Sequence, residues 1–265
     1  MKQLLFSVAA LFATLCATAQ EQVYVVMDDG SALSYQVDKV STISFDASEA
    51  STVKGYFDIV KEIDDLKEQR DTLKKYYYLL KYDGQLVDLG LESGTLWATY
   101  NVGATKPEEY GSYFAWGMTS EYTEGTFGWY DTSYASLKEQ EVIDDNGNLT
   151  ANYDAATANW GEEWRMPTFG EIQELLTLTS EPKEINGVQG RLFHGKNGNT
   201  LFIPFAGFRY DSELNLAGGG GLCWSGTAAE DDRSAYYLFV GSDEAGLYGS
   251  YRSYGQSVRA VLRYK

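Results

Sequence analysis

The sequence predicts an α+β protein in which a large β-rich domain follows a small β element and one long helix. Apolar residues alternate near the N-terminus, which is typical of strands. Between residues 51 and 82 the apolar spacing changes to a repeat of three and four, which is typical of a helix. Beyond residue 86, short apolar runs are broken repeatedly by Gly, Asn and Asp, which indicates short strands joined by long loops.

Residues 1–19 are predicted to be a signal peptide. Lys2 supplies a positive start, residues 4–15 form an apolar run, and Ala17-Thr18-Ala19 gives the small-x-small pattern of a cleavage site before Gln20. We therefore expect an exported protein of the cell surface, the extracellular space or the periplasm.

We expect no membrane insertion and no nucleic-acid partner. The apolar run of the leader is shorter than the roughly 20 residues that a membrane helix needs, and no later segment approaches that length. Leu15 is bulky where a lipoprotein signal has a small residue before its cysteine, which disfavours lipidation at Cys16. The net charge of −17 repels phosphate backbones.

Residues 20–48 are predicted to form a small β meander. Val23, Val25 and Met27 alternate with Tyr24, Val26 and Asp28, and Asp29-Gly30 is a turn signal before the alternation resumes. A third β run spans residues 40–45. Three short strands are marginal alone, so we interpret the meander as an accessory scaffold.

Residues 51–82 are predicted to form one helix. Its apolar positions follow the a/d seam of a coiled coil for about three heptads. Two interpretations stay open, namely a coiled coil that makes a homo-oligomer and an amphipathic helix that packs on its own domain. Arg70 is costly in a dry seam but can set register. The seam consists of Ile59, Ile63, Leu66, Arg70, Leu73, Tyr77 and Leu80.

Residues 86–265 are predicted to form one α+β domain with long loops. One helix is clear over residues 169–179, where Thr168 and Glu171 make a capping box. Arg165, just before it, is expected to bind loop carbonyls or a carboxylate. The strand candidates are residues 86–89, 95–99, 113–116, 201–205, 235–240 and 257–264.

Five strings in this region together resemble one family. They are VDLGLESGTLWATYNVGATKPEEYGSYFAWG (87–117), DAATANWGEEWRMPTFGEIQELL (154–176), NGNTLFIPFAGFR (197–209), CWSGT (223–227) and YRSYGQSVRAV (251–261). Their order and content resemble the Fibrobacter succinogenes major paralogous domain family of exported bacterial proteins. The resemblance implies a C-type-lectin-like fold over residues 86–265. The chain departs from the family pattern at Gly226, Ala260 and residues 178–180, and the family implies a fold better than an activity.

The inventory of reactive side chains argues against an enzyme. His194 is the only histidine, and Cys223 is the only cysteine outside the leader, so a triad base, a multi-histidine metal site and a cysteine pair are all hard to assemble. Acidic residues are abundant, but no spacing marks a glycosidase pair. We expect no catalytic residue and no disulfide.

No cofactor is predicted, although an irregular calcium site over residues 144–148 stays open. Asp144, Asp145 and Asn146 offer oxygen ligands, but an EF-hand needs Gly at the sixth position and Glu at the twelfth, where this chain has Leu149 and Ala155. A solvated turn is the alternative. The glycine run 218–221 lacks the Lys-Ser/Thr of a phosphate loop and is expected to be a flexible loop.

The ligand-binding surface is expected within residues 224–255. In the fold that the resemblance implies, this region carries long ligand-facing loops. Tyrosine faces stack on sugar rings, and carboxylates and guanidinium groups make hydrogen bonds. We therefore predict a surface module that binds or adheres to a glycan or a protein; the alternative is a structural subunit of an envelope assembly or filament. The candidate binding residues are Asp231, Asp232, Arg233, Asp243, Glu244, Tyr248 and Tyr251.

Overall fold

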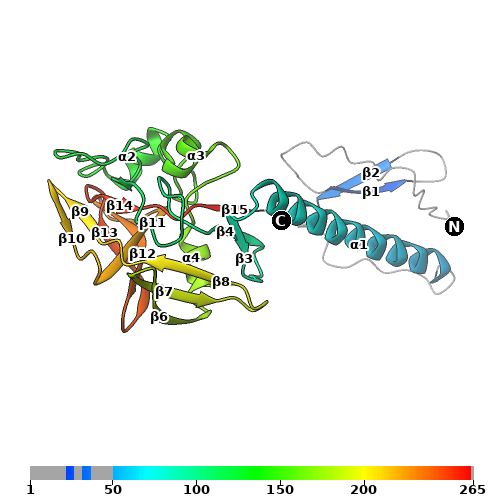
Figure 1. The fold of residues 1–265 in the computed structure, drawn as a ribbon. Helices are drawn as coiled ribbons and strands as arrows, with labels where there is room; N and C mark the ends of the chain where they lie inside the picture. Colours follow the sequence, from blue (N-terminus) through cyan, green and yellow to red (C-terminus); the bar gives the residue numbers. More distant parts are fainter. Residues whose placement is uncertain (1–21, 27–31, 37–49, 264–265) are drawn as a thin grey trace. The chain divides into compact units, whose positions relative to one another are not determined.

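The structure, a computed structural model, is a mixed α+β protein built mostly from strands in several small sheets, with few helices (Figure 1). It describes residues 22–26, 32–36 and 50–263. The chain divides into two compact units, Met1–Arg70 and Asp71–Lys265. The predicted signal peptide and the predicted third strand of the meander, residues 40–45, lie outside the described residues.

The N-terminal hairpin predicted from alternation is confirmed. Strand β1, Gln22–Val26, pairs antiparallel with β2, Ala32–Gln36. The register places Val25 opposite Leu33 and Val23 opposite Tyr35, so residues of the predicted alternation face one another across the pair.

The long helix is confirmed as α1, Ala50–Lys81, within one residue of the predicted bounds at each end. Its last turns pack on the domain that follows: Tyr78, Leu79 and Tyr82 contact the hydrophobic core, and Lys75 Nζ lies 3.2 Å from the Asp88 carboxylate. The predicted seam does not make this contact. Leu66, Leu73, Tyr77 and Leu80 are exposed, so these four seam residues do not belong to the face that packs on the chain's own domain.

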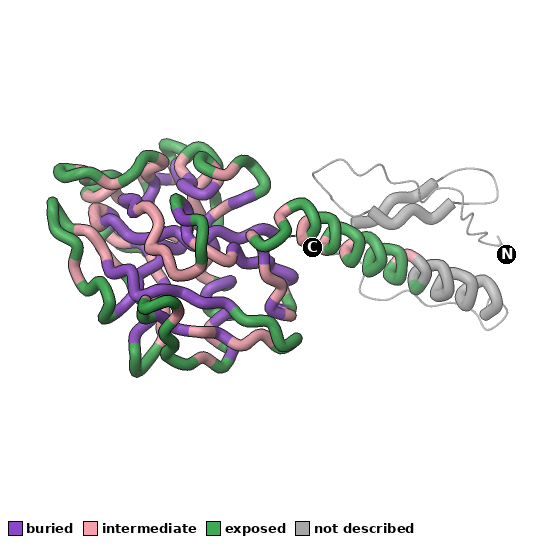
Figure 2. Tube along the Cα trace, in the orientation of Figure 1, coloured by how far each residue is buried: buried purple, intermediate pink, exposed green. Residues whose placement is uncertain are grey.

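The C-terminal unit contains four sheets. The largest has the strand order β13-β12-β11-β14-β5; two three-stranded sheets have the orders β15-β4-β3 and β6-β7-β8; and β9 pairs with β10. Figure 2 shows the buried part of the trace following these strands. The strands are β3 Leu86–Asp88, β4 Thr95–Ala98, β5 Tyr113–Phe114, β6 Thr179–Ile185, β7 Val188–His194, β8 Thr200–Pro204, β9 Phe208–Tyr210, β10 Glu213–Asn215, β11 Gly220–Ala228, β12 Ser234–Gly241, β13 Ala245–Tyr251, β14 Gln256–Ser257 and β15 Val261–Arg263.

Each predicted strand run corresponds to observed strands, with one split. The run 257–264 divides into β14 and β15, because the chain leaves the largest sheet after Ser257 and Val261 joins β4. The predicted flexible loop 218–221 is wrong for its second half. Gly220 and Gly221 begin β11 and are buried there. Glycine is needed at position 221 because a Cβ would lie 2.4 Å from the Pro204 carbonyl oxygen.

Four short helices lie between the strands: α2 Tyr134–Glu139, a 3₁₀ turn Ala151–Tyr153, α3 Ala155–Trp160 and α4 Phe169–Leu175. Helix α4 is the predicted one, and its capping box is confirmed. It is shorter than predicted, because Thr179 already pairs with His194 in β6.

Glu171 joins α4 to the loop before it. The Arg165 guanidinium donates to both carboxylate oxygens of Glu171, at 2.7 and 2.5 Å, and Thr95 donates at 2.8 Å. Burial raises the pKa of Glu171, but the hydrogen bonds and charge of Arg165 outweigh it and hold the pKa below its ordinary value. The expectation that Arg165 binds a carboxylate is confirmed.

Four tryptophans are fully buried, three in one hydrophobic cluster and Trp97 in a second. Trp97, Trp116, Trp164 and Trp224 are at most 1% exposed. Two of them also tie elements together, since Trp116 Nε1 donates to the Ser225 carbonyl and Trp224 Nε1 donates to the Phe114 carbonyl. These bonds join β5 and the residues just after it to β11 of the largest sheet. The end of β11 also lines the pocket described next.

Candidate functional site

The predicted binding residues lie along one hairpin, β12–β13, but not in one place. Ser234 pairs with Tyr251 at one end of the hairpin, and Val240 pairs with Ala245 at the other. Six residues of extended strand separate these pairs, which is about 20 Å at ~3.3 Å per residue. The structure therefore places Asp231, Asp232, Arg233 and Tyr251 at one end and Asp243 and Glu244 at the other.

The first end is an ordered, partly aromatic surface. The Asp231 carboxylate accepts the backbone N–H groups of Arg233 and Ser234 at 2.8 and 2.5 Å. Burial raises the pKa of Asp231, but these N–H donors lower it by more. Arg233 lies over the Tyr130 ring, and its Nε is 3.0 Å from the Asp131 carboxylate. Asp232 is exposed, and Tyr251 packs edge-on against Tyr130.

The second end is an exposed turn with internal contacts. Ser242 Oγ donates to Asp243, and the Tyr248 hydroxyl donates to Glu244 at 3.1 Å. The Glu244 carboxylate raises the pKa of the Tyr248 hydroxyl. Tyr248 lies between the two ends, opposite Tyr237.

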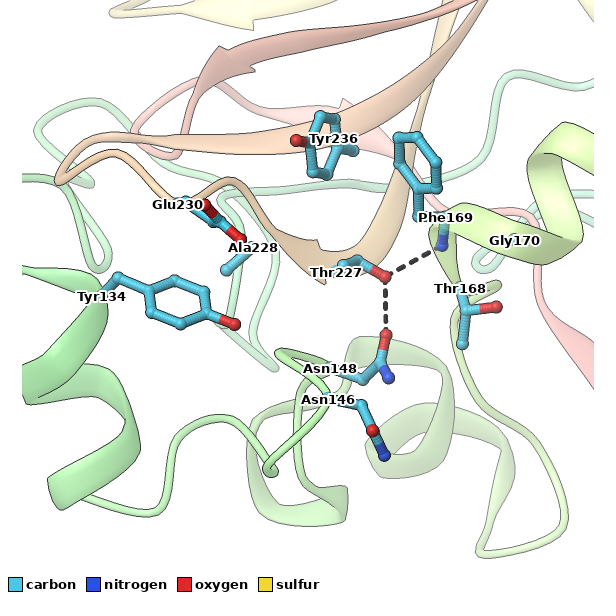
Figure 3. A pocket seen from close by; sticks show the side chains of 10 residues that line it. All are labelled: Tyr134, Asn146, Asn148, Thr168, Phe169, Gly170, Thr227, Ala228, Glu230 and Tyr236. Atoms are coloured by element: carbon cyan, nitrogen blue, oxygen red, sulfur yellow. Dashed lines mark hydrogen bonds between the residues drawn. The ribbon is translucent and has the colours of Figure 1, made fainter.

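A different group of residues surrounds an open cavity of about 440 Å³ (Figure 3). Thr227 and Ala228 of β11 line it, together with residues of α2, of the turn 144–148, of the start of α4 and of β12. In Figure 3, Tyr134 of α2 lies on one side of this space and Phe169 on the other. The lining residues are Tyr134, Asn146, Asn148, Thr168, Phe169, Gly170, Thr227, Ala228, Glu230 and Tyr236.

The turn 144–148 is attached to the edge of β11. The Asp144 carboxylate accepts the N–H groups of Asn146 and Asn148, both at 2.9 Å, so its side chain closes the turn. Leu149 N–H donates to the Gly226 carbonyl at 2.8 Å, and Ala228 N–H donates to the Gly147 carbonyl at 2.9 Å. This attachment places the two asparagines beside the cavity.

Hydrogen bonds also fix one wall of the cavity. Thr227 Oγ1 accepts the Phe169 N–H at 2.9 Å and donates to Asn148 Oδ1 at 2.6 Å, which leaves the Asn148 amide nitrogen for another partner. Phe169 and Tyr236 pack edge-to-face with ring centroids 4.6 Å apart. Gly147 makes room for Tyr134, because a Cβ there would lie 2.5 Å from the Tyr134 hydroxyl.

The chemistry of the lining favours a hydroxyl-rich ligand. It offers aromatic faces, amide groups, hydroxyls and one carboxylate, Glu230, and contains no lysine or arginine. Within the described part of the chain, no hydrogen-bond partner is recorded for the Glu230 carboxylate or the Asn146 side chain. Aromatic walls with a few convergent polar groups are the usual make-up of a small-ligand pocket.

Sequence reasoning missed these residues. The lining is drawn from five segments between residues 134 and 236, and none of them forms a motif by itself. The one local signal is the turn sequence Asp144–Asn148, which predicts an irregular calcium site or a solvated turn but not a pocket wall.

The candidate reactive groups lie apart from the pocket. His194 ends β7, with its Nε2 3.4 Å from the Glu181 carboxylate, and both side chains are largely exposed. Cys223 is buried in β11, and burial raises the pKa of its thiol to about 11. No catalytic constellation is formed by these two residues, and the absence of activity stays a prediction.

The calcium hypothesis also stays a prediction. Over the residues that the structure describes, no group of three or more His, Cys, Asp or Glu side chains is placed to hold a metal ion. Asp144 is exposed, and one of its carboxylate oxygens closes the turn.

Among the described residues, no helix combines the length and apolar character needed to cross a bilayer. No protein-family model, curated protein or solved structure matches the chain.

Proposed function

We propose that this chain is an exported, non-catalytic surface module of the cell envelope that binds or adheres to a hydroxyl-rich ligand, a glycan or a polar protein segment. The observation that carries the proposal is the pocket of Figure 3, in which Tyr134 and Tyr236 accompany Glu230, Asn146 and Asn148 around one cavity. Sugar rings present an apolar face to an aromatic side chain and hydroxyls to amides and carboxylates.

The charge of the pocket narrows the ligand class. Glu230 is the only charged lining residue, so a phosphate or sulfate group would meet a carboxylate and no cation. Neutral glycans and cationic or neutral peptide segments fit this lining better than anionic ligands do.

The same proposal includes the finer fold. A C-type-lectin-like arrangement of residues 86–265 agrees with short strands, long loops and a capped helix, and it would make the segment 224–255 part of the ligand surface. Glu230 and Tyr236 of the pocket belong to that segment. We also propose that α1 is a coiled-coil helix and that the mature protein begins near Gln20.

A glycan array probed with residues 20–265 tests the pocket. Tyr236→Ala and Glu230→Gln should each weaken binding at least ten-fold, because the first removes a stacking face and the second the only carboxylate. Tyr248→Ala is the matched control, since Tyr248 is an exposed tyrosine on the neighbouring strand and outside the pocket. Loss of binding in Tyr248→Ala alone would move the site to β13.

A structural subunit of an envelope assembly is the second candidate. The exposed apolar face of α1 favours it, because such a face is covered in a stable assembly. Recovery of the intact chain in a polymer, together with no binding to glycans or proteins, would favour this function over ligand binding.

A further inference from the structure

Helix α1 presents a row of large apolar side chains to solvent. Leu66, Leu73, Tyr77 and Leu80 are 57%, 70%, 56% and 79% exposed. Single exposed leucines are ordinary, but Leu73, Tyr77 and Leu80 recur every three or four positions, and Leu66 lies on the same face one heptad earlier, with Arg70 between it and Leu73. We call these four apolar residues the stripe. A contiguous apolar stripe on a water-facing helix marks an interaction surface.

The stripe lies opposite the face that α1 uses to contact its own domain. The domain contacts come from Lys75, Tyr78, Leu79 and Tyr82. At about 100° per residue, these positions centre roughly 180° around the helix from the stripe. The domain therefore leaves the stripe accessible. In a coiled coil formed through the stripe, each domain would lie on the outer face of its own helix.

We infer that the stripe binds α1 of a second copy of this chain, parallel and in register. The inference rests on the proposal that α1 is a coiled-coil helix and is independent of the ligand pocket. In the heptad, Ile63 and Tyr77 are a positions and Leu66, Leu73 and Leu80 are d positions. Leucine at each of these d positions, with the β-branched Ile63 at one of the three a positions, favours two strands.

The charges beside the stripe favour the parallel arrangement. Lys67 and Lys74 occupy e positions. In an antiparallel pair, e positions face e positions, so Lys67 of each copy would lie near Lys74 of the other. In a parallel pair, e faces g of the second helix, and Lys74 then lies near Gln69.

Arg70 is the cost of the parallel pair. It occupies an a position, so the two Arg70 side chains meet across an in-register pair. The parallel pair thus has one like-charge contact, between the two Arg70 side chains, and the antiparallel pair has two, each between Lys67 of one copy and Lys74 of the other. The count favours the parallel pair. Removing the charge at position 70 should therefore strengthen association.

Light scattering on residues 20–265 tests the inference. The wild type should show the mass of two chains at high concentration, Leu73→Glu and Leu80→Glu should show one, and Arg70→Leu should lower the dissociation constant at least ten-fold. Thr72→Glu is the matched control, because Thr72 is exposed and adjacent to Leu73 but outside the stripe. If the wild type and the Arg70→Leu variant both stay monomeric at every concentration, the inference is overturned.

Orientation has its own measurement. In a parallel pair, Leu80 meets Leu80 of the second copy, so Leu80→Cys should form an intermolecular disulfide under oxidation, whereas antiparallel helices hold these positions apart. Failure to cross-link, together with dimers in solution, would refute the parallel arrangement. Glycan binding by the monomeric Leu73→Glu variant separates this inference from the ligand proposal, because each chain should keep its own pocket.

Discussion

The C-terminal domain and helix α1 differ in the solvent exposure of their large apolar side chains. In the domain, Trp97, Trp116, Trp164 and Trp224 are at most 1% exposed, whereas on α1 Leu73 and Leu80 are more than two-thirds exposed. Figure 2 shows the same contrast along the trace, with buried segments throughout the domain and mostly exposed positions along the described part of α1. Burial of an apolar side chain stabilises a fold only where the chain supplies the covering surface. The domain supplies that surface itself, whereas we propose that a second copy of the chain covers the stripe of α1.

The largest expected effect is on the domain core. Trp224→Ala should lower the free energy of unfolding by about 3–5 kcal/mol, because it opens a cavity in the core and removes the hydrogen bond to the Phe114 carbonyl. Phe127→Ala, at a side chain 69% exposed, should change it by less than about 0.5 kcal/mol. Urea denaturation followed by tryptophan fluorescence measures both, and equal effects would break the comparison.

The next effect concerns Glu171, the buried carboxylate of α4 to which Arg165 donates. Glu171→Gln should lower the free energy of unfolding by about 2 kcal/mol, less than the ~3–5 kcal/mol of a fully buried pair, because the Arg165 side chain is 34% exposed. Glu139→Gln, on the exposed side of α2, is the control and should be nearly neutral. Thermal unfolding by circular dichroism ranks the two.

A pair of adjacent leucines sharpens the comparison further. Leu79 packs on the domain core and Leu80 is exposed, so Leu79→Ala should cost about 1–2 kcal/mol of stability, and Leu80→Ala should cost less than about 0.5 kcal/mol in the monomer. At concentrations where chains associate, the order of the two variants should reverse: Leu80→Ala should lower the molar mass in solution more than Leu79→Ala does. The same order in both experiments would contradict the separate roles of the two helix faces.

The smallest effect is the pH dependence of the Glu171 contribution. Because the folded pKa of Glu171 is lowered, its contribution is complete above the unfolded value of about 4.3 and is lost as pH falls through the folded pKa. The stability difference between wild type and Glu171→Gln should therefore shrink on acidification below about pH 4. A difference that grows there would show that the pKa is raised, not lowered.

Local patterns predicted the elements whose signals lie in their own residues. The α1 repeat and the Thr168–Glu171 capping box placed both helix starts within one residue. Strand β6 carried no such signal, because Glu181-Pro182-Lys183 is exposed and its pairing with β7 decides its conformation. The start of β11 was predicted wrongly because its glycines are explained by tertiary contacts: a Cβ on Gly221 would meet the Pro204 carbonyl, and a Cβ on Gly220 would meet the Phe239 side chain.

The binding surface was harder to predict than the fold. The segment 224–255 contains Glu230 and Tyr236, so the expected region was partly the one that lines the pocket. The seven side chains predicted to bind do not line the pocket. Nor do they lie together, because the strand register separates Arg233 from Asp243 by the length of the hairpin. Tyr134 and Asn148 could not be found from sequence, since only tertiary contacts bring them to β11.

Buried Arg252 has a consequence for how this pocket would bind. Its guanidinium donates to the Thr132 carbonyl at 2.7 Å and to the Asp231 carbonyl at 3.0 Å, and it also reaches the Ala229 carbonyl, so it holds the backbone on both sides of Glu230. A ligand that meets Glu230 then need not order this loop, and the conformational entropy of ordering it has been lost already during folding.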